Sequence, residues 1–176
     1  MTTIIDGSAG ITYPVVAGSS SAVQASSAKV IQVATYLTGA VATGTGTIPI
    51  DDTIPQITEG TEFMTLAITP TSATNKLIIN MTMQLDKNNA NTLTVAMFQD
   101  STANAIAAQF YGSLGSGVSM PMSYTFSMTA GTTSSTTFRV RAGSEAAGTV
   151  TMNGRGGGRI DGGVAVSSIT IYEVAG

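Results

Sequence analysis

The chain has 176 residues and a mass of 17.8 kDa, which suits one domain with a hydrophobic core. Only 10% of its residues are charged and 43% are hydrophobic, whereas an average soluble domain is about 25% charged. The net charge of −3 and the few, scattered Lys and Arg residues exclude nucleic acid as the main partner. No apolar run approaches the roughly 18 residues of a membrane-spanning helix, so no membrane insertion is expected.

Cysteine and histidine are both absent from the chain. Without cysteine there are no disulfides, thiolate nucleophiles or Cys-bound zinc sites, and without histidine the commonest base that activates a nucleophile is missing. We therefore predict that the protein is not an enzyme and uses no cofactor. A hydrolase that works with carboxylates alone is the remaining catalytic alternative.

The first 28 residues are rich in Gly, Ala and Ser and have no long alternating run. They predict an extended N-terminal arm that becomes ordered on a partner surface, with a disordered tail as the alternative. The N-terminus has neither a basic segment nor a continuous apolar stretch, so synthesis in the cytoplasm without a secretory signal is expected. The candidate attachment residues of the arm are Ile4, Ile5, Ile11, Tyr13, Pro14 and Val15.

The remainder, residues 29–176, has the pattern of a β domain, because short apolar and β-branched runs are separated by Gly, Pro, Asn and Ser clusters. The clearest alternation lies in residues 77–85. For residues 101–109 the sequence is compatible with either a helical turn or a strand. Strands are predicted at residues 30–37, 63–68, 77–85, 93–99, 122–128, 136–141, 149–152 and 167–174. About eight antiparallel strands predict a two-sheet sandwich of the jelly-roll type.

An acidic loop, interrupted by prolines, lies between the first two of these strands. Asp51 and Asp52, with Glu59 and Glu62 nearby, are interpreted as solvated loop residues. The alternatives are oxygen ligands for Ca²⁺ and the acid pair of a glycosidase, although the spacing fits no EF-hand.

A second loop, residues 154–163, is the densest glycine cluster of the chain. It lacks the Lys-Ser/Thr ending of a phosphate-binding loop, so we expect glycines in left-handed conformations. The alternative is an exposed tip that contacts a receptor. Core packing is expected for Phe110 and Tyr111, with stacking on a sugar ring as the alternative. The candidate receptor-facing residues are Tyr111, Ser113, Ser116, Arg155, Arg159 and Asp161.

A chain with so few charges needs another way to stay soluble, and burial of surface in an oligomer is one solution. We predict a homotrimer, which also protects exposed sheet edges. Arg139 and Arg141 alternate along one strand and are candidate subunit-contact residues. Glu145, Glu173 or an acid of a neighbouring subunit would pair with them. The nine methionines are expected to fill gaps in the oligomeric core.

Several segments carry a resemblance to a known family. TGTIPIDDTIPQITEGTEFMTLAITPTSATNKL, LTVAMFQDSTANAIAAQ, MTAGTTSSTTFRVRAG and GTVTMNGRGGGRIDGGVAVSSITIYEV occur in this order. Together they resemble a module near the C-terminal ends of bacteriophage tail-fibre and related virion surface proteins. The start, DGSAGITYPVVAGSSSAVQASSA, is more weakly similar to the segment that follows the shaft of such fibres.

The resemblance implies a virion structural protein, located at the tail or on the head surface. In the preferred interpretation it is a short trimeric tail fibre that attaches to the baseplate through its arm and binds a host surface glycan or protein. The alternative is a capsid decoration protein that contacts the major capsid protein and stabilises the head.

Overall fold

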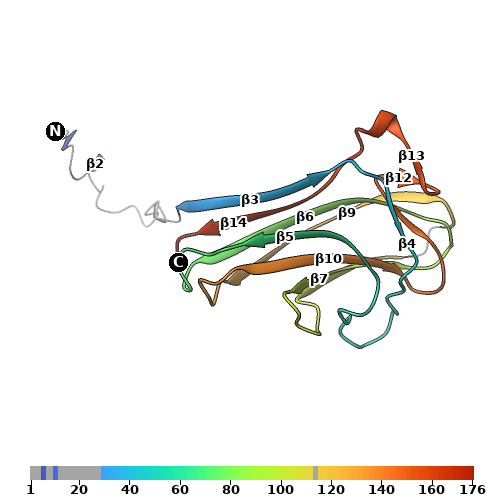
Figure 1. The fold of residues 1–176 in the computed structure, drawn as a ribbon, viewed down its shortest axis with the longest axis horizontal. Coiled ribbons are helices and arrows are strands. Elements are labelled where there is room, and N and C mark those ends of the chain that lie inside the picture. The colour runs from blue at the N-terminus through green and yellow to red at the C-terminus, as the bar shows by residue number, and fades with distance from the viewer. Residues whose placement is uncertain (1–4, 7–9, 12–28, 113–114) are drawn as a thin grey trace, which may run out of the picture.

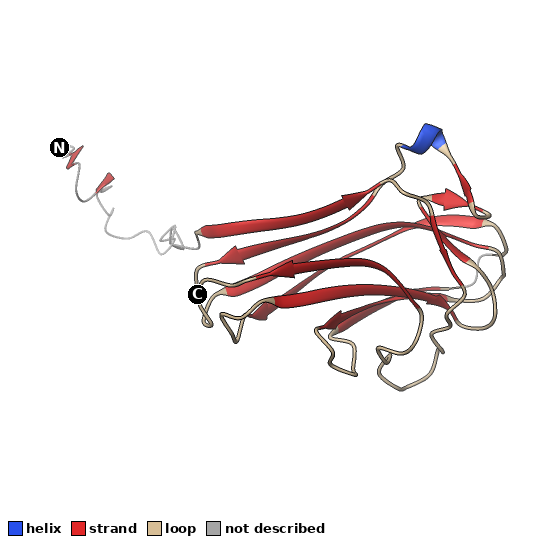
Figure 2. Ribbon diagram, in the orientation of Figure 1, coloured by secondary structure: helices blue, strands red, loops and turns tan. Residues whose placement is uncertain are grey.

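The computed structural model describes residues 5–6, 10–11, 29–112 and 115–176. From residue 29 onward the chain forms two antiparallel β-sheets that pack face to face (Figure 1, Figure 2). The 3₁₀ turn η1 (Asp161–Gly163) is the single helical element of the described residues, so none of them belongs to a helix that could span a membrane. An all-β antiparallel sandwich is confirmed as the fold class.

The strands have the following bounds. Strand β1 (Ile5–Asp6) pairs with β2 (Gly10–Ile11), and both precede the strands of the sandwich in the sequence. The remaining strands are β3 (Val30–Thr38), β4 (Ala42–Gly44), β5 (Thr61–Ile68), β6 (Lys76–Lys87), β7 (Leu93–Gln99), β8 (Ala107–Tyr111), β9 (Val118–Thr129), β10 (Thr136–Ser144), β11 (Val150–Met152), β12 (Gly154–Arg155), β13 (Gly158–Arg159) and β14 (Ser167–Val174).

The larger sheet is organised around β6, which pairs with β9 along its whole length. On its other side β6 pairs first with β14 and then with β11. Strand β14 pairs in turn with β3, and β11 with β4. Strands β9 and β3 are therefore the long edges of this sheet, and both strands are visible along the upper layer in Figure 1.

The smaller sheet has the order β5-β10-β7-β8, with β5 and β8 at its edges. The core lies between the two sheets and follows the alternation of β6, whose inward side chains are 0 or 1% exposed. These are Leu77, Ile79, Met81, Met83 and Leu85. Because side chains on a strand alternate between faces, the sequence pattern of residues 77–85 correctly predicted this core.

Strand β7 is buried on both faces because the loop between β4 and β5 covers the outer side of the smaller sheet. Ile48 of this loop is fully buried against Ala96 and Phe98. The loop approaches β10 at Gly143, where an added Cβ would lie 2.7 Å from the Gly46 carbonyl oxygen. Glycine at this position therefore permits the close approach.

The sequence predictions differ from the structure in several short elements. Strand β8 starts inside the segment 101–109 that was left open, and it extends the smaller sheet by pairing with β7. Strand β4 and the hairpin β12–β13 were missed because each has only two or three residues. The methionines on the strands fill the core of a single subunit, which corrects the expectation of an oligomeric core.

The predicted division at residue 28 stays a prediction. Of the candidate attachment residues, Ile5 and Ile11 pair across β1 and β2. Ile4, Tyr13, Pro14 and Val15 lie outside the described residues.

Candidate functional site: a neutral sheet face and the loops at its end

The outer face of the larger sheet carries three rows of side chains that cross four strands. Directly paired residues of antiparallel strands point to the same side of a sheet, so the pairing registers define these rows. The rows are Val33–Tyr172–Ile78–Ser127, Thr35–Thr170–Asn80–Thr125 and Leu37–Ser168–Thr82–Ser123. None of these residues is charged, and we call this set the neutral face.

The middle row is joined by side-chain hydrogen bonds. The hydroxyl groups of Thr35 and Thr170 lie 2.5 Å apart, and the Thr125 hydroxyl donates to Asn80 Oδ1 over 2.9 Å. The outer rows add apolar groups at their β3 end, where Leu37 is 62% exposed and Val33 is 54% exposed. The face is therefore uncharged and partly apolar, which is typical of a surface that is covered in an assembly.

Sequence analysis did not identify this face. Its signal is in residues 30–37, where exposed apolar residues fall on both sides of the strand instead of alternating with polar ones. A solvated edge strand would carry charged residues or proline. The described part of β3 carries neither.

At one end of the neutral face the two glycine-rich loops meet. Arg155 Nη2 donates to the carbonyl oxygen of Gly117 over 2.8 Å, which joins the loop before β9 to the β12–β13 hairpin. Sequence analysis named residues of both loops as receptor-facing, and the structure brings Ser116, Arg155, Arg159 and Asp161 to this end in exposed positions. Ser113 lies outside the described residues, so its placement stays open.

The glycine-rich hairpin has the conformation expected from its sequence. Gly156 and Gly157 both have positive φ, 56° and 82°, as in the two-residue turns that suit a right-twisted hairpin. The buried carboxylate of Asp86 anchors it, because Asp86 Oδ2 accepts the backbone N–H of Gly156 over 2.9 Å. Asp86 Oδ1 accepts the Ser119 hydroxyl over 3.2 Å, which ties the same carboxylate to β9.

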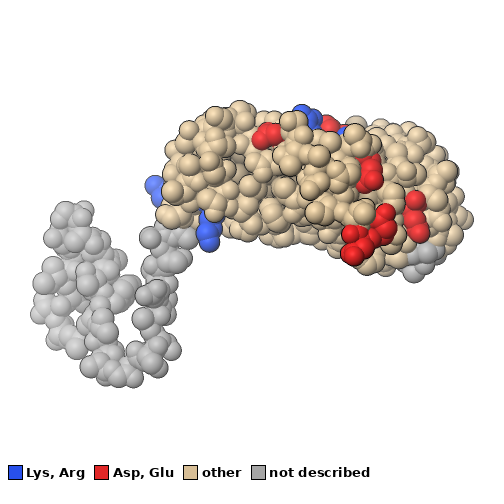
Figure 3. All heavy atoms as spheres, turned by 90° about the horizontal axis from the view of Figure 1, so that it is seen from below, with Lys and Arg blue, Asp and Glu red and all other residues tan. Residues whose placement is uncertain are grey.

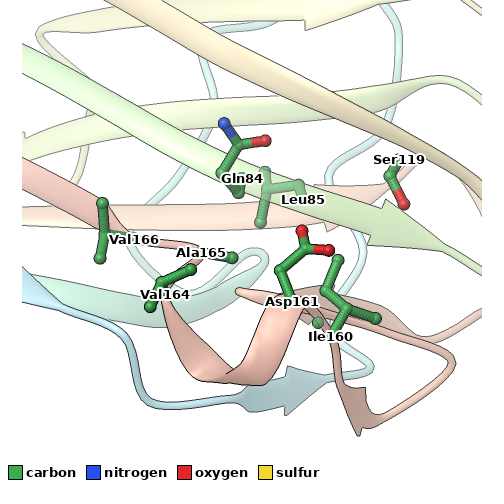
Figure 4. Close-up of a pocket in the computed structure, with 9 residues that line it drawn as sticks. Gln84, Leu85, Ser119, Ile160, Asp161, Val164, Ala165 and Val166 are labelled. Atoms are coloured by element: carbon green, nitrogen blue, oxygen red, sulfur yellow. The ribbon is translucent and has the colours of Figure 1, made fainter.

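Beside this hairpin, η1 folds over the end of β6 and encloses a cavity of about 300 Å³. Figure 4 shows the Asp161 carboxylate pointing from the turn toward the strand that carries Gln84 and Leu85. Asp161 has φ of 49°, which is unusual for a residue other than glycine. The walls combine aliphatic side chains with the polar groups of Gln84, Ser119 and Asp161, and Val164 is 77% exposed.

Arg139 and Arg141 lie on the same face of β10, as predicted, but their partner differs from the expected acids. Both guanidinium groups contact the carboxylate of Glu62, at 3.2 Å and 3.5 Å, rather than Glu145 or Glu173. Arg141 also donates to the carbonyl oxygens of Glu59 and Gly60, at 2.7 Å and 2.8 Å. Arg141 therefore holds the covering loop within one subunit, while a contact between subunits stays a prediction.

Glu173 is a buried carboxylate at the opposite end of the sandwich. Its Oε1 accepts bonds from Asn75 Nδ2 at 2.5 Å and from the backbone and hydroxyl of Thr71 at 2.8 Å each. Gln32 Nε2 donates to Oε2 over 2.6 Å. Burial raises the pKa of Glu173, but the hydrogen bonds outweigh it and lower the pKa from 4.5 to about 2. This cage joins β3 and the loop after β5 to the last strand.

Lys87 is another buried titratable group, at the end of β6. Its ammonium donates to the backbone carbonyl oxygen of Asn91. Burial lowers the pKa of Lys87, and the nearby Glu145 partly opposes this effect. The lysine closes the loop between β6 and β7, so its position indicates a structural role.

The remaining candidates lie on the smaller sheet and its covering loop. Within the described residues no three acidic side chains gather closely enough to hold a metal ion. Asp51 Oδ1 accepts the backbone N–H and the hydroxyl of Thr53, at 2.8 Å and 2.5 Å.

The expectation of core packing was wrong for the two aromatic residues, since Phe110 is 68% exposed and Tyr111 is 41% exposed.

With this geometry in hand, the chain can be compared with known proteins. Its sequence matches the family of the Pgp3 C-terminal domain over residues 41–176. The chain belongs to this family. Among curated proteins, none matches it.

Three solved structures similar to this chain illustrate how distant its structural relatives are. The CBM36-1 domain of a xylanase from the hindgut metagenome of Trinervitermes trinervoides is 13% identical, with a TM-score of 0.36 over 75% of this chain and 96% of that one. Latent PorU of Porphyromonas gingivalis is 9% identical, with a TM-score of 0.41 over 85% of this chain and 14% of that one. The structure of infectious bursal disease virus, Gx strain, is 16% identical, with a TM-score of 0.38 over 83% of this chain and 37% of that one. With identities and scores this low, these likenesses carry no weight for function.

The family membership corrects the resemblance to phage tail fibres. The four main segments quoted for that resemblance lie within the match to the Pgp3 C-terminal domain, whereas the weakly similar start, residues 6–28, lies before it. The expected roles as a tail fibre or a capsid decoration protein are therefore wrong, as is the expected location in a virion. The expected role of residues 1–28 in virion attachment is therefore wrong as well.

Proposed function

We propose that the chain is a non-catalytic, homotrimeric binding domain of a Pgp3-family protein, with the neutral face as its subunit contact. The family is that of a secreted, virulence-associated bacterial protein, and a binding role suits such a setting. The single observation that carries the proposal is the neutral face itself. Its exposed apolar residues Val33 and Leu37 would otherwise be left in water at the sheet edge.

The arrangement of the edges favours a ring. The two long edges of the larger sheet are different strands, β3 and β9, and neither has a partner on its outer side among the described residues. A contact between the β9 part of the neutral face of one subunit and the β3 part of the neutral face of the next joins two different surfaces, so it is heterologous, and such contacts close only as rings. Three subunits form the smallest ring of this kind.

The side chains of β9 suit this contact. Its outward residues are short and hydroxyl-bearing, such as Ser123, Thr125 and Ser127, and all three are exposed. Short neutral side chains let a second backbone approach closely and leave no buried charge to compensate. The same composition explains how a chain with 10% charged residues remains soluble once assembled.

The non-catalytic part of the proposal rests on the absence of cysteine and histidine from the whole sequence. The carboxylate of Glu173 is fully buried and accepts hydrogen bonds from Asn75, Thr71 and Gln32. A carboxylate in such a cage is stabilised as an anion and is a poor general base.

A pair of matched substitutions tests the proposal. Leu37→Asp places a charge on the neutral face, at the β3 edge, and should convert the trimer to a monomer, because burying an unpaired carboxylate is costly. Ala67→Asp is the control, since Ala67 is exposed on β5, the edge strand of the other sheet. Light scattering coupled to size-exclusion chromatography measures both masses. Equal trimer masses for the two variants would refute the neutral face as the contact.

A further inference from the structure

A groove on the opposite sheet combines an exposed aromatic ring with polar groups that have no partner. It lies between the covering loop, at residues 49–55, and the edge strand β8, and it consists of two adjoining cavities of about 200 Å³ and 330 Å³. Both cavities are lined by Asp51, Thr53, Pro55 and Ala108, so they form one continuous depression.

Phe110 borders the smaller cavity and is 68% exposed, the second most exposed of the large hydrophobic residues. Across the groove, Ile50 is 44% exposed and Ile54 is 53% exposed. An apolar ring and two aliphatic side chains kept in water around a depression indicate a surface that receives a ligand.

A polar group that lacks a partner lies in the same cavity. Thr94 is only 4% exposed, and its hydroxyl oxygen is buried without any hydrogen bond. A buried hydroxyl without a partner costs free energy, and such groups in native structures need an explanation. A ligand hydroxyl in the cavity would supply the missing partner.

Carboxylates lie at the rim. The hydrogen bonds from Thr53 fix Asp51 Oδ1 and lower the pKa of Asp51, which keeps this residue an anionic acceptor. Asp52 lines the larger cavity beside it. Figure 3 shows one face of the molecule, and most of the acidic side chains visible there lie in the right-hand half of the view.

We infer that this groove binds the terminal sugars of a neutral glycan, with Phe110 stacked on a ring and Thr94, Asp51 and Asp52 bonded to hydroxyl groups. A sugar has an apolar C–H face for the aromatic ring and vicinal hydroxyls that donate to carboxylates. It also satisfies Thr94, whose hydroxyl needs both a donor and an acceptor. A lysine side chain would pair with the carboxylates but offers Thr94 no acceptor, because an ammonium group only donates.

The groove belongs to a single subunit and lies on the sheet opposite the neutral face. Its test is therefore independent of the proposed trimer, and failure of one proposal leaves the other standing. Two adjoining cavities suit two consecutive rings, so a disaccharide should bind more tightly than its monosaccharides.

The experiment is saturation-transfer NMR on the full chain with a panel of neutral hexoses, pentoses, their N-acetylated forms and the corresponding disaccharides. At least one disaccharide should give transfer from the protein. Thr94→Val keeps the shape and removes only the hydroxyl, so affinity should fall about three- to tenfold with no loss of melting temperature. Phe110→Ala should weaken binding about tenfold or more.

Tyr111→Ala is the matched control, because Tyr111 is the neighbouring aromatic residue and does not line the groove. It should leave affinity unchanged. No transfer from any sugar of the panel would overturn the proposal, as would sugar binding that Phe110→Ala and Thr94→Val leave intact. Binding of a basic peptide in place of any sugar would also overturn it.

Discussion

The carboxylate of Glu173 and the side-chain amide of Asn75 meet in a 2.5 Å hydrogen bond, although 98 residues separate them in the sequence. Thr71 and Gln32 complete the cage around the same carboxylate. One buried side chain on the last strand thus joins the first strand of the sandwich to the loop after β5. Hydrogen bonds to a charged acceptor are the stronger kind, so this cage is a main tie at that end of the fold.

Glu173→Gln should lower the free energy of unfolding by about 2–4 kcal/mol at neutral pH, because several donors lose a charged acceptor in a buried place. The substitution keeps the size of the side chain, so packing is not the cause. Urea unfolding at pH 7 measures the difference. A loss below about 0.5 kcal/mol would show that the cage contributes little.

The same carboxylate predicts an acid dependence. Its pKa is about 2 in the folded protein and 4.5 without the cage, so the folded state favours the charged form. The stabilisation is complete above pH 4.5 and is lost as the pH falls toward 2. The difference in unfolding free energy between wild type and Glu173→Gln should therefore shrink over this interval. A difference that is constant with pH would contradict the assignment.

Arg141 and Arg139 should differ in their effect on stability, although they share Glu62. Arg141 is 17% exposed in its side chain and bonds two loop carbonyl oxygens, whereas Arg139 is 35% exposed. Arg141→Ala should cost about 2 kcal/mol, and Arg139→Ala less than about 1 kcal/mol, the usual range of an exposed ion pair. Thermal unfolding of both variants under the same conditions decides this. Equal losses of stability would mean that Arg141 contributes through its ion pair with Glu62 and that its hydrogen bonds to the loop add nothing.

Asn153 is the most constrained polar residue near the glycine-rich hairpin. It is fully buried with φ of 56°, and its Nδ2 donates to the Thr38 carbonyl oxygen over 2.8 Å. Ser167 donates to Asn153 Oδ1 over 2.7 Å. Asn153→Ala should cost about 2–4 kcal/mol, because it removes these bonds and adds backbone strain. Asn153→Gly is the control, because it removes the same hydrogen bonds but tolerates the positive φ. It should therefore be about 1 kcal/mol more stable than Asn153→Ala. Chemical denaturation compares them, and equal costs would exclude a contribution from the backbone.

Much of the fold could be predicted from the sequence because several core strands alternate between apolar and polar residues. Residues 77–85 and 167–174 are examples, and both lie centrally in the larger sheet. Strand β8 could not be predicted, since an alanine-rich segment has no periodicity of its own and becomes a strand by pairing with β7.

The interaction surfaces were harder to foresee than the core. Arg139 and Arg141 were correctly placed on one face, but their partner Glu62 comes from β5, and only the register of β5 with β10 brings it there. The neutral face depends in the same way on the pairing of four strands that are distant in sequence. The resemblance to phage tail fibres indicated the wrong family, while the fold class, an antiparallel β-sandwich, was correctly predicted from composition and periodicity.

In the proposed assembly, the neutral face joins three copies of this chain. Sedimentation equilibrium of the full chain at neutral pH tests it most directly, since it yields the mass of the assembly without assumptions about shape. We expect a mass three times the 17.8 kDa of one chain, independent of concentration over the measured range. A mass of one chain at all concentrations would contradict the claim and leave Val33 and Leu37 without an explanation.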